Sequence, residues 1–256
     1  MKPLILHCHM PKTAGSALNR QVFMPRHDPS RIKLAYGVKF ERRRRFPTDE
    51  MALPNDVEFI AGHVPVGYAD DLGRHVLHVS ILRDPVERMF SFLNFVAVAP
   101  RHGLRRRFDV DIVALAQTDP AEYVSLMLAD DMVRLRQTNV MTRLASGMAR
   151  LSKNSPAEPQ LRRALKYIRS GWYEIGTQEN FDHFAKRLKD RLNTLDSGCV
   201  QAGPLIAGSG VAEKRLPRII SKADATPRMI DMVRDANTLD QRLYDFVSDQ
   251  NARTAH

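Results

Sequence analysis

The chain has few cysteines and no long apolar run, the features that are typical of small secreted proteins and of membrane proteins. Among its 256 residues there are only two cysteines, Cys8 and Cys199, and one tryptophan. Neither cysteine has a partner at metal-ligand spacing, which argues against a disulfide framework and a structural zinc site. No apolar run approaches the roughly 18 residues of a membrane span, and residues 4–6 are too short for a secretory signal. We therefore expect a protein of the reducing cytoplasm without a membrane span.

The chain also has fewer acidic residues than basic residues. The chain has 29 Asp and Glu residues against 39 Lys and Arg residues, which gives a formal net charge of +10. Arginine clusters at residues 42–45 and 105–107 indicate either a solvated basic surface or a field that attracts anionic ligands. Nucleic acid is not the expected partner, because no zinc finger, RNP-type aromatic motif or basic zipper accompanies this charge.

Apolar residues make up 43% of the chain, which supports a substantial core. Short apolar runs predict strands at residues 3–9, 57–61, 75–82 and 172–176. Helical spacing predicts helices at residues 15–23, from 85 onward, 110–148 with a break at Asp119-Pro120, 160–169, 181–195 and in two closing stretches, the second near 239–247. This alternation is typical of an α/β fold with a parallel sheet flanked by helices. We expect one domain over residues 1–256, with a helix-rich second half.

A lysine, a glycine and two hydroxyls lie in the predicted turn after the first strand. The residues are Lys12, Thr13, Ala14, Gly15 and Ser16. Backbone N–H groups at the start of a helix, together with a lysine, suit an anionic group such as phosphate. Because the lysine precedes the glycine, the spacing differs from the Gly-x-x-x-x-Gly-Lys-Ser/Thr loop that binds ATP or GTP. The alternative is an ordinary strand-to-helix turn with a surface lysine.

A second cluster follows the third predicted strand. Arg83 lies at the carboxyl end of that strand, where open α/β sheets bind their ligands. Asp84 is placed to cap a helix with Pro85 at its first position and Glu87 at its third, a capping-box arrangement. The arginine fork and the hydroxyl of Ser91, two turns later, suit a second phosphate. The alternative is that Arg83 pairs with Asp84 or Glu87.

Together the two clusters resemble the nucleotide-binding motifs of sulfotransferases that use 3′-phosphoadenosine-5′-phosphosulfate (PAPS). The similarity is closest to the carbohydrate branch that includes the uronyl 2-O-sulfotransferases. Weaker similarities to that branch extend over residues 4–247, at residues 59–64, 138–144, 175–181 and 237–244. The resemblance implies a P-loop-NTPase-like sulfotransferase fold. It also implies transfer of a sulfuryl group from PAPS to an acceptor hydroxyl, with 3′,5′-adenosine bisphosphate as the product.

The resemblance assigns a role to each matching residue. The loop from Lys12 to Ser16 holds the 5′-phosphosulfate, and Lys12 neutralises the charge that develops on the leaving phosphate. Arg83 and Ser91 grip the 3′-phosphate. His63 is the general base that takes the proton of the acceptor hydroxyl, since a histidine pKa of about 6.5 lies near working pH.

A further expected donor contact is Lys214, at the end of the glycine-containing stretch 197–214, which lies where family members close a loop over the nucleotide. No metal is expected, because a sulfuryl group carries less charge than a phosphoryl group and in-line transfer needs positioning and cationic donors. The implied acceptor is a hydroxyl on a saccharide or glycolipid. The membrane anchor and lumenal disulfides of Golgi relatives are missing from the pattern, so we expect a cytoplasmic, bacterial-style enzyme rather than one that sulfates glycosaminoglycans.

Several roles stay open at this point. His7 and His9 flank the first strand as structural residues, with His9 near enough to the loop to touch a ligand. For Arg143 there are two interpretations. It contacts the donor or an anionic acceptor, or it forms a surface salt bridge. Two other functions are also compatible with the sequence. One is a nucleotide or small-molecule kinase on a related sheet, and the other is a polyanion-binding module without catalysis.

Overall fold

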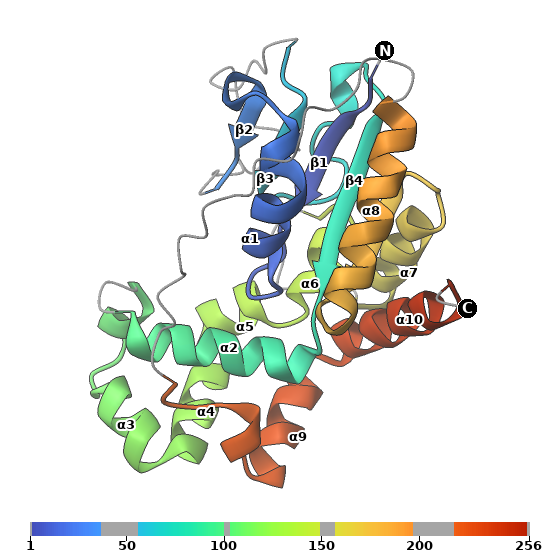
Figure 1. Ribbon diagram of the computed structural model, residues 1–256. Coiled ribbons are helices and arrows are strands. Elements are labelled where there is room, and N and C mark those ends of the chain that lie inside the picture. The colour runs from blue at the N-terminus through green and yellow to red at the C-terminus, as the bar shows by residue number, and fades with distance from the viewer. Residues whose placement is uncertain (1, 37–55, 100–102, 149–156, 197–217, 255–256) are drawn as a thin grey trace.

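The computed structural model describes residues 2–36, 56–99, 103–148, 157–196 and 218–254. Within them lies a five-stranded sheet in which every pairing is parallel (Figure 1). The strands are β1 (Leu4–Cys8), β2 (Ile32–Leu34), β3 (Phe59–Gly62), β4 (Val76–Leu82) and β5 (Tyr173–Thr177). Their order across the sheet is β2-β3-β1-β4-β5, so β1 is the central strand. The expected α/β class with a parallel sheet is confirmed.

The helices follow the predicted pattern with more breaks. They are α1 (Gly15–Leu18), α2 (Pro85–Val98), α3 (Ile112–Thr118), α4 (Pro120–Ala129), α5 (Asp131–Gln137), α6 (Val140–Ala145), α7 (Ala157–Ile168), α8 (Phe181–Asp196), α9 (Pro227–Ala236) and α10 (Thr238–Thr254). The first predicted helix, residues 15–23, is one α-helical turn followed by a π-helical turn, η1 (Asn19–Phe23). No helix of the described residues is long and apolar enough to cross a membrane.

The two faces of the sheet are covered by different helices. On β1, Leu4, Leu6 and Cys8 join the core formed with α6, α7 and α10, whereas Ile5 joins the core formed with α1, η1 and α8. All four side chains are buried, and this matches the alternation of side chains along a strand that is covered on both faces. A third core joins α2, α3, α4, α5 and α9, which lie beyond the tips of the strands in Figure 1. After residue 130 the described residues form α5 to α10 and one strand, β5, which confirms the expected helix-rich second half.

The start of α2 confirms half of the predicted capping box. The carboxylate of Asp84 accepts a hydrogen bond from the backbone N–H of Glu87 over 2.8 Å. The reciprocal bond is not made, because the Glu87 carboxylate pairs with Arg83 and the N–H of Asp84 donates to Glu179 instead. The cap fixes the direction in which α2 leaves the end of β4.

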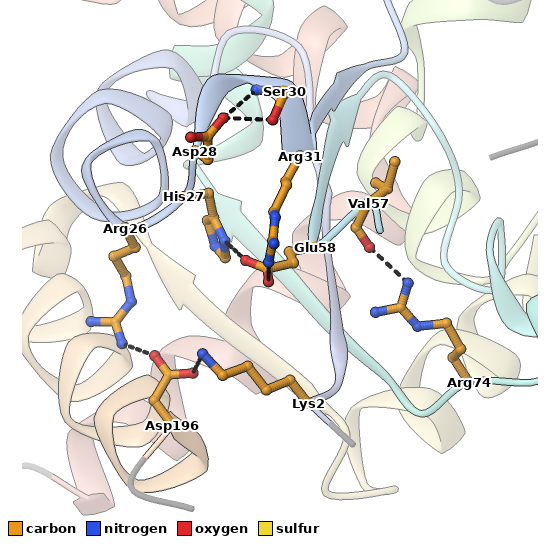
Figure 2. Close-up of polar contacts among 10 residues, drawn as sticks. All are labelled: Lys2, Arg26, His27, Asp28, Ser30, Arg31, Val57, Glu58, Arg74 and Asp196. Atoms are coloured by element: carbon orange, nitrogen blue, oxygen red, sulfur yellow. Dashed lines mark hydrogen bonds and ion pairs between the residues drawn. The ribbon is translucent and has the colours of Figure 1, made fainter. Parts of the chain in front are cut away.

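Polar contacts hold the opposite edge of the sheet, where the strands begin (Figure 2). Asp196, at the end of α8, pairs with Arg26 over 2.6 Å and with Lys2 over 3.4 Å. Glu58, just before β3, binds both Arg31 and His27. These pairs connect the starts of β1, β2 and β3 with one another and with the end of α8. They all lie at the edge of the sheet opposite to the carboxyl ends of the strands.

Two of the weaker similarity segments, 138–144 and 237–244, form a reciprocal helix cap. The side-chain oxygen of Asn139 accepts the N–H groups of Leu239 and Asp240 at the start of α10. The buried carboxylate of Asp240 in turn accepts the N–H groups of Met141 and Thr142 in α6. Each helix therefore satisfies the first-turn donors of the other, and this gives both segments a structural role.

Candidate functional site

The site lies at the carboxyl edge of the sheet, between β1 and β4. The chain leaves β1 toward β2 and β3 on one side, and leaves β4 toward β5 on the other. Such a divergence of connections opens a crevice at the ends of the two strands, where ligands of open α/β sheets bind. The loop after Cys8 and the segment that begins with Arg83 form its two sides.

One open pocket of about 550 Å³ occupies this position. Every described residue that the sequence predicts for the site lines it: Lys12, Thr13, Ala14, Gly15, Ser16, His63, Arg83 and Ser91. Lys214 falls outside the described residues. Among the described residues, the charged side chains in the pocket wall are those of Lys12 and Arg83, and both are cationic. Segments far apart in sequence, from His9 to Gln178, thus form one anion-attracting cavity.

The loop after β1 has an unusual backbone. Lys12 and Ala14 both have positive φ values, 68° and 67°, in the left-handed region that costs most non-glycine residues about 1–3 kcal/mol. The hydroxyl of Thr13 is buried and donates to the carbonyl of Met10 over 2.9 Å. Its side chain therefore shapes the loop. Strain of this kind is retained where the surrounding structure fixes a functional geometry.

The ring of His9 leaves no room for a side chain at position 15. A Cβ atom at position 15 would lie 2.1 Å from Cδ2 and 2.5 Å from Nε2 of that ring, far inside van der Waals contact. The sequence suggests a glycine that lets the loop approach a ligand closely. The structure shows that it lets His9 pack directly beneath the loop.

Arg83 is tied to both sides of the pocket. One Nη atom pairs with the carboxylate of Glu87 over 3.2 Å, and the other lies 3.5 Å from the carbonyl oxygen of Lys12. The pairing with Glu87 that the sequence left as an alternative is therefore present, within a guanidinium that also lines the pocket. Its five donors allow a phosphate to bind alongside these partners.

The first three turns of α2 supply the wall opposite the loop. Ser91, Phe92 and Phe95 line the pocket, and the ammonium of Lys12 lies 4.6 Å from the centre of the Phe95 ring. This cation–π contact holds the lysine across the opening. The two phenylalanines escaped the sequence analysis because their helical spacing is also typical of core residues.

His63 follows the end of β3 and has one ring nitrogen committed. Its Nδ1 lies 2.7 Å from the backbone carbonyl oxygen of His9, and since a carbonyl only accepts, Nδ1 carries the proton. Nε2 is then the basic nitrogen, on a side chain that is exposed on the pocket wall. The packed surroundings lower the pKa of His63 below 6.5, and the hydrogen bond to the carbonyl opposes that shift. The ring is therefore neutral at pH 7.

Two glutamines complete the lining and were not predicted. Gln178 follows β5 directly, and Gln137 ends α5. The Oε1 atom of each is buried without a hydrogen-bond partner among the described residues. Gln178 follows a predicted strand and lies in the similarity segment 175–181, whereas nothing in the sequence distinguished Gln137.

Arg143 is not among the residues that line the pocket, and within the described residues it forms no salt bridge. Its guanidinium donates to the backbone carbonyls of Leu135 and Arg136 near the end of α5. Burial lowers the pKa of Arg143 to about 10. The side chain joins α6 to α5 instead of reaching the pocket.

The described residues contain no group of three or more His, Cys, Asp or Glu side chains arranged to hold a metal ion. No family model matches the chain, and no curated protein sequence matches it either. The activity of the site is therefore inferred from its own geometry and chemistry.

Proposed function

We propose that the chain is a PAPS-dependent sulfotransferase that acts on a hydroxyl of a saccharide or glycolipid. The observation that carries the proposal is the convergence of the Lys12 loop, Arg83 with Ser91, and His63 on one pocket. Two cationic anchors on neighbouring strands suit a nucleotide with phosphate groups at both its 5′ and 3′ positions. A histidine with an available Nε2 beside them suits a hydroxyl acceptor.

Each residue has a defined part in the transfer. His63 takes the proton of the acceptor hydroxyl at Nε2 while the acceptor oxygen forms its bond to sulfur. The bond from sulfur to the bridging oxygen breaks, and its electron pair stays on the 5′-phosphate, where Lys12 offsets the new charge. Arg83 and Ser91 hold the 3′-phosphate and fix the nucleotide along the line of transfer. The products are the sulfated acceptor, 3′,5′-adenosine bisphosphate and a proton on His63.

The fold and the compartment fit the same proposal. A central first strand followed by an anion-binding loop and a helix supports a P-loop-NTPase-like sulfotransferase fold. We place the enzyme in the cytoplasm because its cysteine content is low and Cys8 is a buried, free thiol in the core.

Thermal denaturation with 3′,5′-adenosine bisphosphate tests donor binding. At 100 times its Kd the nucleotide is expected to add about 2.7 kcal/mol of stability and to raise the melting temperature by several degrees. Adenosine 5′-monophosphate, which lacks the 3′-phosphate, should raise it far less. Arg83→Ala should abolish the difference between the two nucleotides, whereas Arg228→Ala, at an exposed position on α9, should preserve it.

The same assay separates the competing functions. Stabilisation by ATP but not by the bisphosphate, together with magnesium-dependent turnover, would establish a kinase and refute the proposal. No response to any nucleotide, with polyanion binding that weakens steeply with salt, would establish a binding module. Transfer of labelled sulfate from PAPS to a panel of saccharides, glycolipids and phenols then identifies the acceptor.

A further inference from the structure

His9 occupies the floor of the pocket, next to His63. Its ring is 5.0 Å from that of His63, between centroids, and it stacks on His7 at 5.3 Å. Only 7% of the residue is exposed, yet it lines the cavity. The Cδ2–Nε2 edge of the ring faces Gly15 in the loop from Lys12 to Ser16. His9 is therefore packed against the loop that is expected to bind the anion.

A chain of hydrogen bonds leads from His7 through Asn19 and Tyr36 to Nδ1 of His9. Asn19 accepts from Nδ1 of His7 through its side-chain oxygen, and its amide donates to the Oη of Tyr36 over 3.1 Å. The hydroxyl hydrogen of Tyr36 is then available for Nδ1 of His9, 2.6 Å away. When Tyr36 donates to it, Nδ1 of His9 is the acceptor and Nε2 carries the ring hydrogen.

The remaining nitrogen of His9 is uncommitted. Within the described part of the chain, Nε2 makes no hydrogen bond to another residue. Burial, reinforced by the neighbouring His7 and His63, lowers the pKa of His9 to about 3. The imidazole is therefore a neutral donor at any physiological pH, and a neutral donor does not lose its hydrogen to the group it contacts.

We propose that His9 is a second catalytic histidine, which donates from Nε2 to an oxygen of the transferring sulfuryl group. The inference rests on the proposed function. His63 accepts a proton at its Nε2 while His9 donates a hydrogen bond from its own, so the two rings hold opposite tautomers for opposite tasks. His9 is preorganised for this by Tyr36 and by contact with Gly15, and its hydrogen bond strengthens as charge develops on the sulfuryl oxygens.

The tautomers are measurable without substrate. Long-range ¹H–¹⁵N correlation spectra of the histidine-labelled protein at pH 7 should show His9 protonated at Nε2 and His63 protonated at Nδ1, with assignments from single His→Gln variants. Tyr36→Phe removes the hydroxyl that holds Nδ1, so the His9 signals should move toward a mixture of tautomers while those of His63 stay. A His9 ring protonated at Nδ1 in the unmodified protein would overturn the proposal.

Two isosteric substitutions test the catalytic part. The amide nitrogen of His9→Gln replaces Nε2, whereas that of His9→Asn replaces Nδ1. The probe is hydrolysis of labelled PAPS to 3′,5′-adenosine bisphosphate and sulfate, with water as the acceptor. His9→Asn should slow it about 10²–10³-fold, the usual loss of one such donor, and His9→Gln should restore most of the rate.

Binding of the bisphosphate separates this inference from the proposed function. The product lacks the sulfuryl group, so both variants should retain its stabilising effect. If the unmodified protein does not bind the bisphosphate, the proposed function fails whatever His9 does. If it binds and hydrolyses PAPS, but His9→Asn hydrolyses it at the same rate, the role of His9 alone is refuted.

Discussion

The side chain of His63 donates through Nδ1 to the backbone carbonyl oxygen of His9, 2.7 Å away. This single bond joins the end of β3 to the end of β1, and it determines which nitrogen of His63 is basic. A backbone acceptor cannot change its protonation state, so the tautomer is constant wherever the ring is neutral. His63 is thus presented to the pocket as a base by the fold itself.

His63→Ala should lower kcat by about 10²–10⁴-fold, the usual contribution of a general base. Binding of 3′,5′-adenosine bisphosphate should be unchanged, because the proposed function places the ring against the acceptor and not against the nucleotide. Measurement of both in one preparation distinguishes loss of chemistry from loss of folding. Weakened nucleotide binding with unchanged kcat would assign His63 to the donor site instead.

The proposed role of His63 as the base predicts a pH dependence for sulfuryl transfer. The base must be neutral, and the packed surroundings of the ring lower the pKa of His63 below 6.5. The value of kcat/KM should therefore rise with pH through a midpoint below that of an exposed histidine and then level off. A midpoint above 6.5 would contradict the assignment of His63 as the base.

Gly15→Ala should lower the stability of the protein and weaken nucleotide binding. The added methyl group would lie 2.1 Å from the ring of His9, which its neighbours prevent from moving away. Overpacking of this kind costs about 1–3 kcal/mol, measurable as a lower midpoint of urea denaturation, and bisphosphate binding should weaken as the loop shifts. Gly103→Ala is the control, since nothing lies within 4 Å of its added methyl group. Equal effects of the two substitutions would show that contact with His9 does not require the glycine.

The sequence was sufficient to predict the elements that carry the site. Buried strands give short runs of mostly apolar residues, and β1, β3, β4 and β5 were predicted from such runs. The edge strand β2 was not, because its three residues, Ile32, Lys33 and Leu34, leave Leu34 half exposed and show no apolar run. Short edge strands are defined by pairing with a neighbour, here β3, and pairing is not a local property of the sequence.

The site was predictable where chemistry is local and unpredictable where it depends on distant contacts. Lys12 and Arg83 were found because each follows a strand. The tautomers of His9 and His63 depend on Tyr36 and on a backbone carbonyl from another strand. Similarity alone marked residues 138–144 and 237–244, and only the structure shows that these segments cap one another's helices.

Stability should fall steeply in mild acid because two histidines are buried as neutral rings. Burial lowers the pKa of His7 to about 4 and that of His9 to about 3, whereas the unfolded chain has the ordinary value of 6.5. Between pH 6.5 and pH 4 the unfolded state therefore binds more protons, so their contribution is present above pH 6.5 and is lost as pH falls. From pH 7 to pH 5 the loss is about 2 kcal/mol for each histidine.

Urea denaturation between pH 5 and pH 7 measures this loss. His7→Asn and His9→Gln each remove one titrating ring, so each should reduce the slope of unfolding free energy against pH by about one proton in this range. The double variant should reduce it by about two. An unchanged slope in both single variants would mean that these rings are protonated in the folded protein.

The reciprocal cap between α6 and α10 predicts a set of effects on stability alone. Asn139 has a positive φ of 48°, and its side-chain oxygen accepts two N–H groups of α10. Asn139→Asp keeps an acceptor and should cost least, Asn139→Gly keeps only the backbone conformation, and Asn139→Ala loses both. The alanine variant should lose about 2 kcal/mol of unfolding free energy. Asn139 does not line the pocket, so the melting-temperature increase produced by 3′,5′-adenosine bisphosphate should be the same in all three variants. A selective loss of that increase would show that the cap also positions the donor site.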